Sequence, residues 1–89
     1  MKHAGADALD RIAPLLGQLR KRADLQEKRP GVFYWKSRAF LHFHEDPKGI
    51  FADVRLRDDF TRLPVNTKIQ RETLLGKVDR RLARGNPRA

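Results

Sequence analysis

Two histidines and an aspartate in the middle of the chain are the residues whose types and spacing could support chemistry. His42 and His44 lie two positions apart in a run of alternating apolar residues. That spacing on a β-strand points both imidazoles to one side, about 7 Å apart. Asp53 lies in a second alternating run. Two imidazoles and a carboxylate suit a zinc or iron ion, and a histidine beside a carboxylate also suits general acid–base chemistry.

A β-hairpin must position these three residues. The apolar residues that alternate with polar ones in its two strands are Ala39, Leu41, Phe43, Ile50, Ala52, Val54 and Leu56. Pairing apolar with apolar sets His42 opposite Asp53 and His44 opposite Phe51, with Ala39 opposite Leu56 at the far end. A shift of one residue would expose one apolar set, so the pattern favours this register.

The outer face of this hairpin is also a candidate binding surface. The register predicts that it carries, beside the histidines, Arg38, Phe40, Phe51, Arg55 and Arg57. Aromatic rings and guanidinium groups on an open sheet are typical of single-stranded nucleic-acid binding. The alternative is that a helix, a terminal segment or a second copy of the chain covers the face, because monomers avoid exposed aromatic patches. A homodimer through this face is therefore a second hypothesis.

The C-terminal third is the other candidate binding region. Residues 60–89 hold eight Lys/Arg against two Asp/Glu, out of a net charge of +9 for 89 residues. A helical wheel gathers five of these cations on one arc, namely Lys77, Arg80, Arg81, Arg84 and Arg88. Such a stripe can follow the phosphates of a nucleic acid. The alternative is an ordinary solvated helix face.

Composition excludes several classes of protein. The chain has no cysteine, so it has neither disulfides nor thiolate metal ligands, which fits a reducing cytoplasm. No apolar run reaches the roughly 20 residues of a membrane span, and no secretory signal is evident. No Gly-rich phosphate loop or nucleophile motif occurs. We therefore expect a cytoplasmic protein without a bound cofactor.

The pattern along the chain predicts an α+β fold in one small domain. We expect a single antiparallel sheet of three or four strands, flanked by an N-terminal and a C-terminal helix on one face. The N-terminal helix either starts near Asp10 or has a kinked start near Asp7, because Pro14 interrupts it. Thr67 and Gln70 predict a capping box for the C-terminal helix. The expected elements are a helix over 10–23, strands over 25–29, 32–36, 38–45 and 50–57, an extended segment over 60–65 as an edge strand, and a helix over 68–84.

Three short segments resemble small uncharacterised bacterial domains grouped near the luciferase-like domain family. They are a Pro-Gly-Val turn over 30–32, an Arg-x-Phe-x-His-x-His strand over 38–44 and a Gly-led strand over 49–56. The resemblance covers roughly thirty of the 89 residues. It implies an α+β fold with an antiparallel sheet and no established activity. The positions to which it gives functional weight are Arg38, Phe40, His42, His44 and Asp53.

These observations favour a small non-enzymatic binding domain. Its basic C-terminal helix and its aromatic and histidine-bearing sheet face would contact a partner, either nucleic acid or a protein, including a second copy of the chain. The alternative is a metal- or histidine-dependent enzyme centred on His42, His44 and Asp53.

Overall fold

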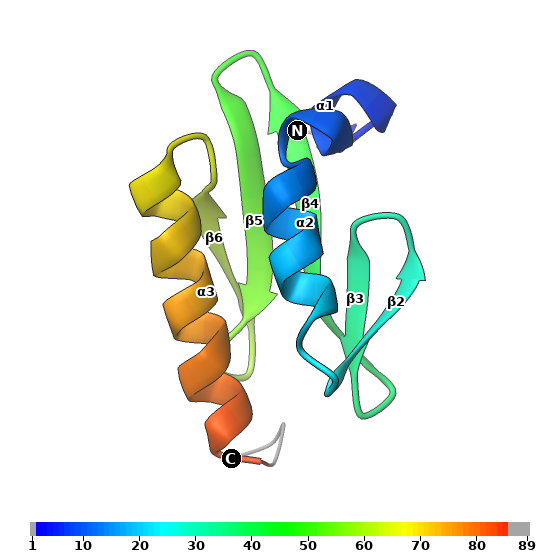
Figure 1. Ribbon diagram of the computed structural model, residues 1–89, viewed down its shortest axis with the longest axis vertical. Helices are drawn as coiled ribbons and strands as arrows, with labels where there is room; N and C mark the ends of the chain where they lie inside the picture. The colour runs from blue at the N-terminus through cyan, green and yellow to red at the C-terminus, as the bar shows by residue number, and fades with distance from the viewer. Residues whose placement is uncertain (1, 86–89) are drawn as a thin grey trace.

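The computed structural model describes residues 2–85. Its elements, in chain order, are β1 (Lys2–His3), α1 (Ala6–Arg11), α2 (Ala13–Arg20), β2 (Leu25–Arg29), β3 (Val32–Trp35), β4 (Arg38–Asp46), β5 (Gly49–Arg55), β6 (Phe60–Pro64) and α3 (Lys68–Ala83). The two longer helices, α2 and α3, lie side by side on the same face of the sheet (Figure 1). The predicted α+β class, with helices at both ends of the chain on one face, is confirmed.

Within residues 2–85 the sheet has six strands, so the predicted three or four is wrong. Strands β2 to β6 follow one another in sequence order across the sheet, and every neighbouring pair is antiparallel. The extended segment near Phe60 is indeed the edge strand β6. Strand β1 pairs with β4 and was not expected, because a strand of two residues is too short to show alternation.

The predicted register of the central hairpin is confirmed. Strands β4 and β5 pair His42 with Asp53 and His44 with Phe51. The turn over 46–49 is also as expected, and Gly49 has a φ of +133° there. A Cβ atom at Gly49 would lie 2.6 Å from Oδ1 of Asn66, so only glycine fits between the turn and the loop that follows β6.

A β-bulge at Phe40 overturns one predicted pair and one predicted site residue. Strand β3 pairs Phe33 with Leu41 and Tyr34 with Ala39, which leaves Phe40 unpaired between them. The bulge turns Phe40 away from the outer face, and its ring lies edge-on to Trp35 in the core, 2% exposed. Phe40 is therefore a core residue and not the outer-face binding residue that we predicted.

The same distortion ends the pairing of β4 with β5 early. The ladder stops at Leu41 and Val54, so the predicted pairing of Ala39 with Leu56 does not form. Instead, Nε of Arg55 donates a hydrogen bond to the carbonyl oxygen of Ala39 at 3.1 Å. The side chain of Arg55 thus satisfies a backbone group that the ladder leaves unpaired.

The N-terminal helical region is kinked, as one of the two alternatives predicted. It begins at Ala6, and Ile12 leaves the helical conformation with φ −104° and ψ +20°. Pro14 then lies in the first turn of α2, where the N–H that proline lacks would have no intrahelical partner. Ile12 itself is fully buried, so the kink keeps both short helices on the core.

Helix α3 begins with the predicted capping box. The backbone N–H of Gln70 donates to Oγ1 of Thr67 at 3.1 Å, and that of Thr67 donates to Oε1 of Gln70 at 3.1 Å. Arg71 occupies an apolar position of the helix. Its guanidinium reaches out to donate to the carbonyl oxygen of Val65 at 2.8 Å, as the snorkelling of long cationic side chains allows.

The core lies between the helices and the inner face of the sheet. Leu15, Leu19, Leu74 and Val78 from the helices and Phe33, Leu41, Phe43 and Val54 from the strands are all buried there. Within residues 2–85, no helix combines the length and the apolar character needed to cross a membrane.

The capping box yields a stability prediction. Replacing Thr67 with Ala removes the acceptor for the Gln70 N–H and should lower the free energy of unfolding by about 1 kcal/mol in urea denaturation. Thr73→Ala, an exposed position within the same helix, is the matched control. It should change stability by less than about 0.5 kcal/mol, since Ala is the better helix former. Equal losses in both variants would contradict the role of the cap.

Candidate functional site

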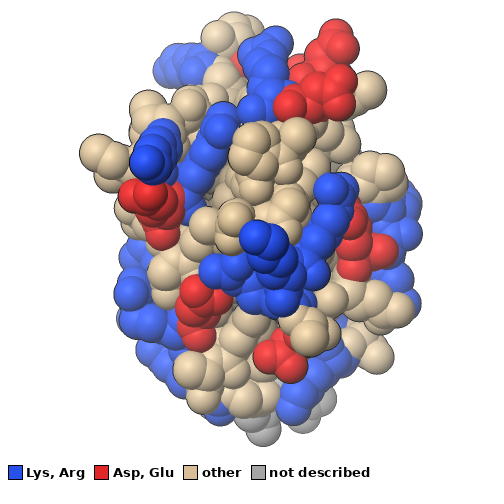
Figure 2. All heavy atoms as spheres, viewed as in Figure 1, with Lys and Arg blue, Asp and Glu red and all other residues tan. Residues whose placement is uncertain are grey.

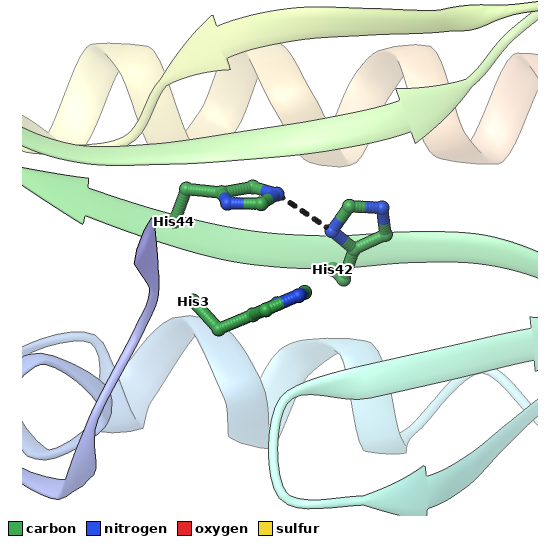
Figure 3. A group of neighbouring side chains, drawn as sticks. All are labelled: His3, His42 and His44. Carbon is green, nitrogen blue, oxygen red and sulfur yellow. Dashed lines mark hydrogen bonds between the residues drawn. The ribbon is translucent and has the colours of Figure 1, made fainter. Parts of the chain in front are cut away.

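The open face of the sheet, which carries no helix, holds the residues that could bind a metal or take part in acid–base chemistry. Residues 42, 44 and 53 alternate with the buried residues of β4 and β5, so their side chains lie on this face. Strand β1 adds His3, which pairs with His44. Figure 3 shows the result: His3 reaches in from β1 beside the two histidines of β4. All three histidines of the chain are therefore neighbours.

The three imidazoles are close enough to act together. Nε2 of His44 lies 3.0 Å from Nδ1 of His42. The ring of His3 stacks on that of His44, with centroids 4.8 Å apart and planes inclined by 27°. One ring nitrogen from each of the three can be chosen so that all lie within 4.8 Å of one another. We call this group the histidine cluster.

Few bonds hold the strand that supplies His3. Beyond the two residue pairs of β1 with β4, the backbone N–H of Ala4 donates to the carbonyl oxygen of Phe43 at 3.1 Å. The N–H of Gly5 donates to Oε2 of Glu45 at 2.6 Å. His3 is exposed, whereas His42 and His44 are half-buried. The cluster therefore has two histidines on the β4–β5 hairpin and a third on a short, lightly held strand.

A carboxylate with a fixed orientation borders the cluster. Asp53 accepts two hydrogen bonds from Arg62 of β6, at 2.8 Å to each oxygen. Its Oδ2 also lies 3.0 Å from Nε2 of His44. The Arg62 guanidinium, followed by the charges that the two histidines can carry, lowers the pKa of Asp53 in spite of its burial. Asp53 is therefore an anion at neutral pH.

The environment keeps the imidazoles of the hairpin neutral. Burial is the main cause that lowers the pKa of both His42 and His44 below the ordinary value of 6.5. The charge of Asp53 opposes this effect, while repulsion from the other histidines and from Arg62 adds to it. Both rings can therefore offer a nitrogen lone pair at neutral pH.

The second ring nitrogen of His44 lies inside the protein. Its Nδ1 is buried and makes no hydrogen bond of good geometry within residues 2–85. The backbone carbonyl of Lys2 is nevertheless close enough to raise the pKa of His44 to a small extent. This leaves Nε2, which faces His42 and Asp53, as the nitrogen through which His44 would act.

Aromatic and cationic side chains frame the cluster on the side of β6. Phe60 packs its ring edge-on against His42, with centroids 4.9 Å apart. The guanidinium of Arg55 lies 4.3 Å from the centroid of Phe60. Phe51 is half-buried on the same face. Of the predicted residues, Phe51 and Arg55 thus lie near the cluster, while Arg38 is exposed at the turn between β3 and β4, opposite Trp35.

The remaining predicted residues form a separate group beside α3. Arg57 lies beyond the end of β5 and borders the same surface hollow as Lys77, Arg80 and Arg84. Arg57 was expected on the outer sheet face, and its place beside α3 corrects that prediction. Arg81 was expected on a solvated stripe but is 2% exposed. Arg88 lies outside the described residues.

Sequence reasoning missed two residues of the site. His3 comes from a strand too short to predict, and the only signal for it was that it is the one remaining histidine of the chain. Arg62 lies directly opposite Asp53 in the β5–β6 ladder. Pairing the expected edge strand over 60–65 residue by residue with the preceding strand would have placed Arg62 opposite Asp53.

The chain matches no protein-family model, no curated protein and no solved structure. The resemblance to the luciferase-like domain family therefore stays a prediction. The homodimer through the outer face also stays a prediction, although Phe40, one of the aromatic residues expected on that face, is in the core.

The lowered pKa values of His42 and His44 predict an acid-sensitive fold. As the pH falls through 6.5, the unfolded chain binds more protons at these residues than the folded chain does. Their contribution to stability is therefore complete above that pH and is lost below it. Metal-free urea denaturation between about pH 7 and about pH 5 should show stability falling with pH.

The double variant His42→Gln/His44→Gln is the control for this pH dependence and should flatten the profile. Asp53 does not interfere, since its pKa lies below the ordinary 3.8 and its contribution disappears only at lower pH. An unchanged slope in the double variant would assign the acid sensitivity to other groups.

Proposed function

We propose that this protein binds one transition-metal ion through His3, His42 and His44. The observation that carries the proposal is the convergence of all three histidines of the chain, from two strands, on one point of the open sheet face. Histidines placed at random on a small surface would rarely share a ligand distance. The alternation of β4 and the pairing of β1 bring the three rings together.

The distances suit a metal centre. Zinc–imidazole bonds of about 2.0–2.1 Å place neighbouring ligand nitrogens roughly 3 Å apart. The His42 and His44 nitrogens are already at that spacing, 3.0 Å. The third nitrogen, within 4.8 Å of the others, needs to approach by about 1–2 Å. His3 is exposed, so a rotation of its side chain can supply this movement.

Protonation and charge also favour a cation. Metal binding requires neutral imidazoles, and burial lowers the pKa of His42 and His44 so that no proton has to be displaced from them at neutral pH. The anionic Asp53 offsets part of the ion's charge. Its Oδ2, 3.0 Å from Nε2 of His44, is positioned either as a fourth ligand or as an acceptor for a metal-bound water.

The ligand set selects the class of metal. Three imidazoles with a carboxylate suit zinc and the neighbouring divalent ions cobalt, nickel and iron, whereas calcium and magnesium prefer oxygen ligands. The chain has no cysteine, so the site lacks thiolates, the ligands that favour copper(I) and iron–sulfur clusters. We therefore assign zinc or a similar divalent ion.

Titration with Zn²⁺ tests the proposal on protein without a histidine tag. Isothermal calorimetry should find one ion per chain, with affinity falling at acid pH as the imidazoles of His42 and His44 gain protons. Co²⁺ should give the visible absorption bands of a low-coordinate nitrogen site. His3→Ala and His44→Ala should each weaken binding by more than about tenfold, and Asp53→Asn by about 10- to 100-fold.

Asp10→Asn, an exposed carboxylate on α1, is the matched control for Asp53→Asn and should bind as the unmodified protein does. Circular dichroism of each variant separates lost ligands from lost folding. Unchanged Zn²⁺ affinity in His3→Ala would contradict the role of His3 as a ligand. Absence of Zn²⁺ binding by the unmodified protein would disprove the proposed metal site.

A further inference from the structure

We propose that a basic hollow beside α3 binds the phosphate backbone of a nucleic acid. The hollow has a volume of about 160 Å³ and is lined by Leu56, Arg57, Lys77, Arg80, Arg81 and Arg84. Of the six lining residues within the described part of the chain, five are cations and none is acidic. Figure 2 shows lysines and arginines along the lower left edge of the molecule, over the C-terminal half of α3.

Within residues 2–85, four cations of the hollow, Arg57, Lys77, Arg80 and Arg84, form no ion pair. Among residues 2–85, the ion pairs of Lys and Arg are Arg20 with Glu27, Arg22 with Asp79, and Arg62 with Asp53. Asp79, the nearest acidic residue along α3, is held by two hydrogen bonds of 3.0 Å from Arg22. Asp58 and Asp59 follow Arg57 but do not line the hollow.

The floor of the hollow is rigid. Arg81 is 2% exposed, and its guanidinium lies 4.9 Å from the centroid of the Trp35 ring. A guanidinium over an aromatic ring is held in place by the cation–π attraction. The four more exposed cations around Arg81 attract an anion into the hollow.

A nucleic-acid backbone fits these features better than other polyanions. Cations on successive turns of one helix, with Arg57 beside them, can meet several phosphates in a row. The hollow exposes no aromatic ring on which a base could stack, because Trp35 is only 3% exposed. Binding should therefore depend on the backbone and not on sequence. This site lies on the helix side of the sheet and does not depend on the histidine cluster.

The single tryptophan of the chain reports on the site, because Trp35 lies directly beneath Arg81. Oligonucleotide binding should change the Trp35 fluorescence and raise the anisotropy of a labelled oligonucleotide, with little difference between base sequences. The slope of log affinity against log salt should correspond to about four phosphates.

A matched pair of double variants locates the site. Arg80→Gln/Arg84→Gln should weaken oligonucleotide binding about tenfold or more and reduce the salt slope by about 2. Lys48→Gln/Lys68→Gln removes the same charge from two exposed lysines outside the hollow and should change affinity by less than about threefold. Circular dichroism confirms that both variants fold.

Three outcomes would overturn the proposal. Equal losses in the two double variants would mean diffuse attraction to net charge. Binding to phosphatidylserine vesicles without binding to oligonucleotides would assign the hollow to a lipid surface. No binding to either probe at low salt would leave the cations as a solvated helix face.

Discussion

The pairing of β4 with β5 is the constraint on which the rest of the molecule depends. Because side chains alternate along a strand, one register decides at once which residues are buried and which form the open face. Leu41 opposite Val54 fixes the core beneath the helices, and His42 opposite Asp53 fixes the functional face. A shift of one residue would place imidazoles against α2 and α3 and leave the core unfilled. Core packing therefore holds the cluster in place.

The two faces of the sheet differ in how their charged side chains are paired. On the open face, Arg62 neutralises Asp53, and burial keeps His42 and His44 uncharged. The histidine cluster therefore offers nitrogen lone pairs beside a neutralised carboxylate. On the helix side, Arg57, Lys77, Arg80 and Arg84 line the hollow beside α3 and form no ion pair within residues 2–85.

Much of the fold could be predicted from the sequence because the alternation and the turn residues are local signals. The hairpin register, the capping box at Thr67 and the edge strand near Phe60 all follow from residue types within a few positions. The features that the sequence did not predict depend on tertiary contacts. The bulge at Phe40 arises from packing on Trp35, and the burial of Arg81 arises from the same ring. Alternation alone predicts neither.

The candidate site was predictable only in part for the same reason. His42, His44 and Asp53 share a hairpin, so their relation follows from one register. His3 is separated from them by some forty residues of sequence, and only the pairing of β1 with β4 brings it near. A strand of two residues is too short for side-chain alternation to reveal it in the sequence. Arg62 was within reach, since β6 follows β5 directly and pairs with it.

The division of the histidine cluster between two strands has a thermodynamic consequence. His42 and His44 are preorganised by a paired hairpin, so an ion that binds them orders little new structure. His3 is on a strand that two residue pairs and two further backbone hydrogen bonds hold. Segments with so few contacts open at low free-energy cost. An ion that recruits His3 also closes β1 onto β4, because binding energy favours the closed state by mass action. Metal binding at the histidine cluster would then be thermodynamically coupled to the ordering of β1.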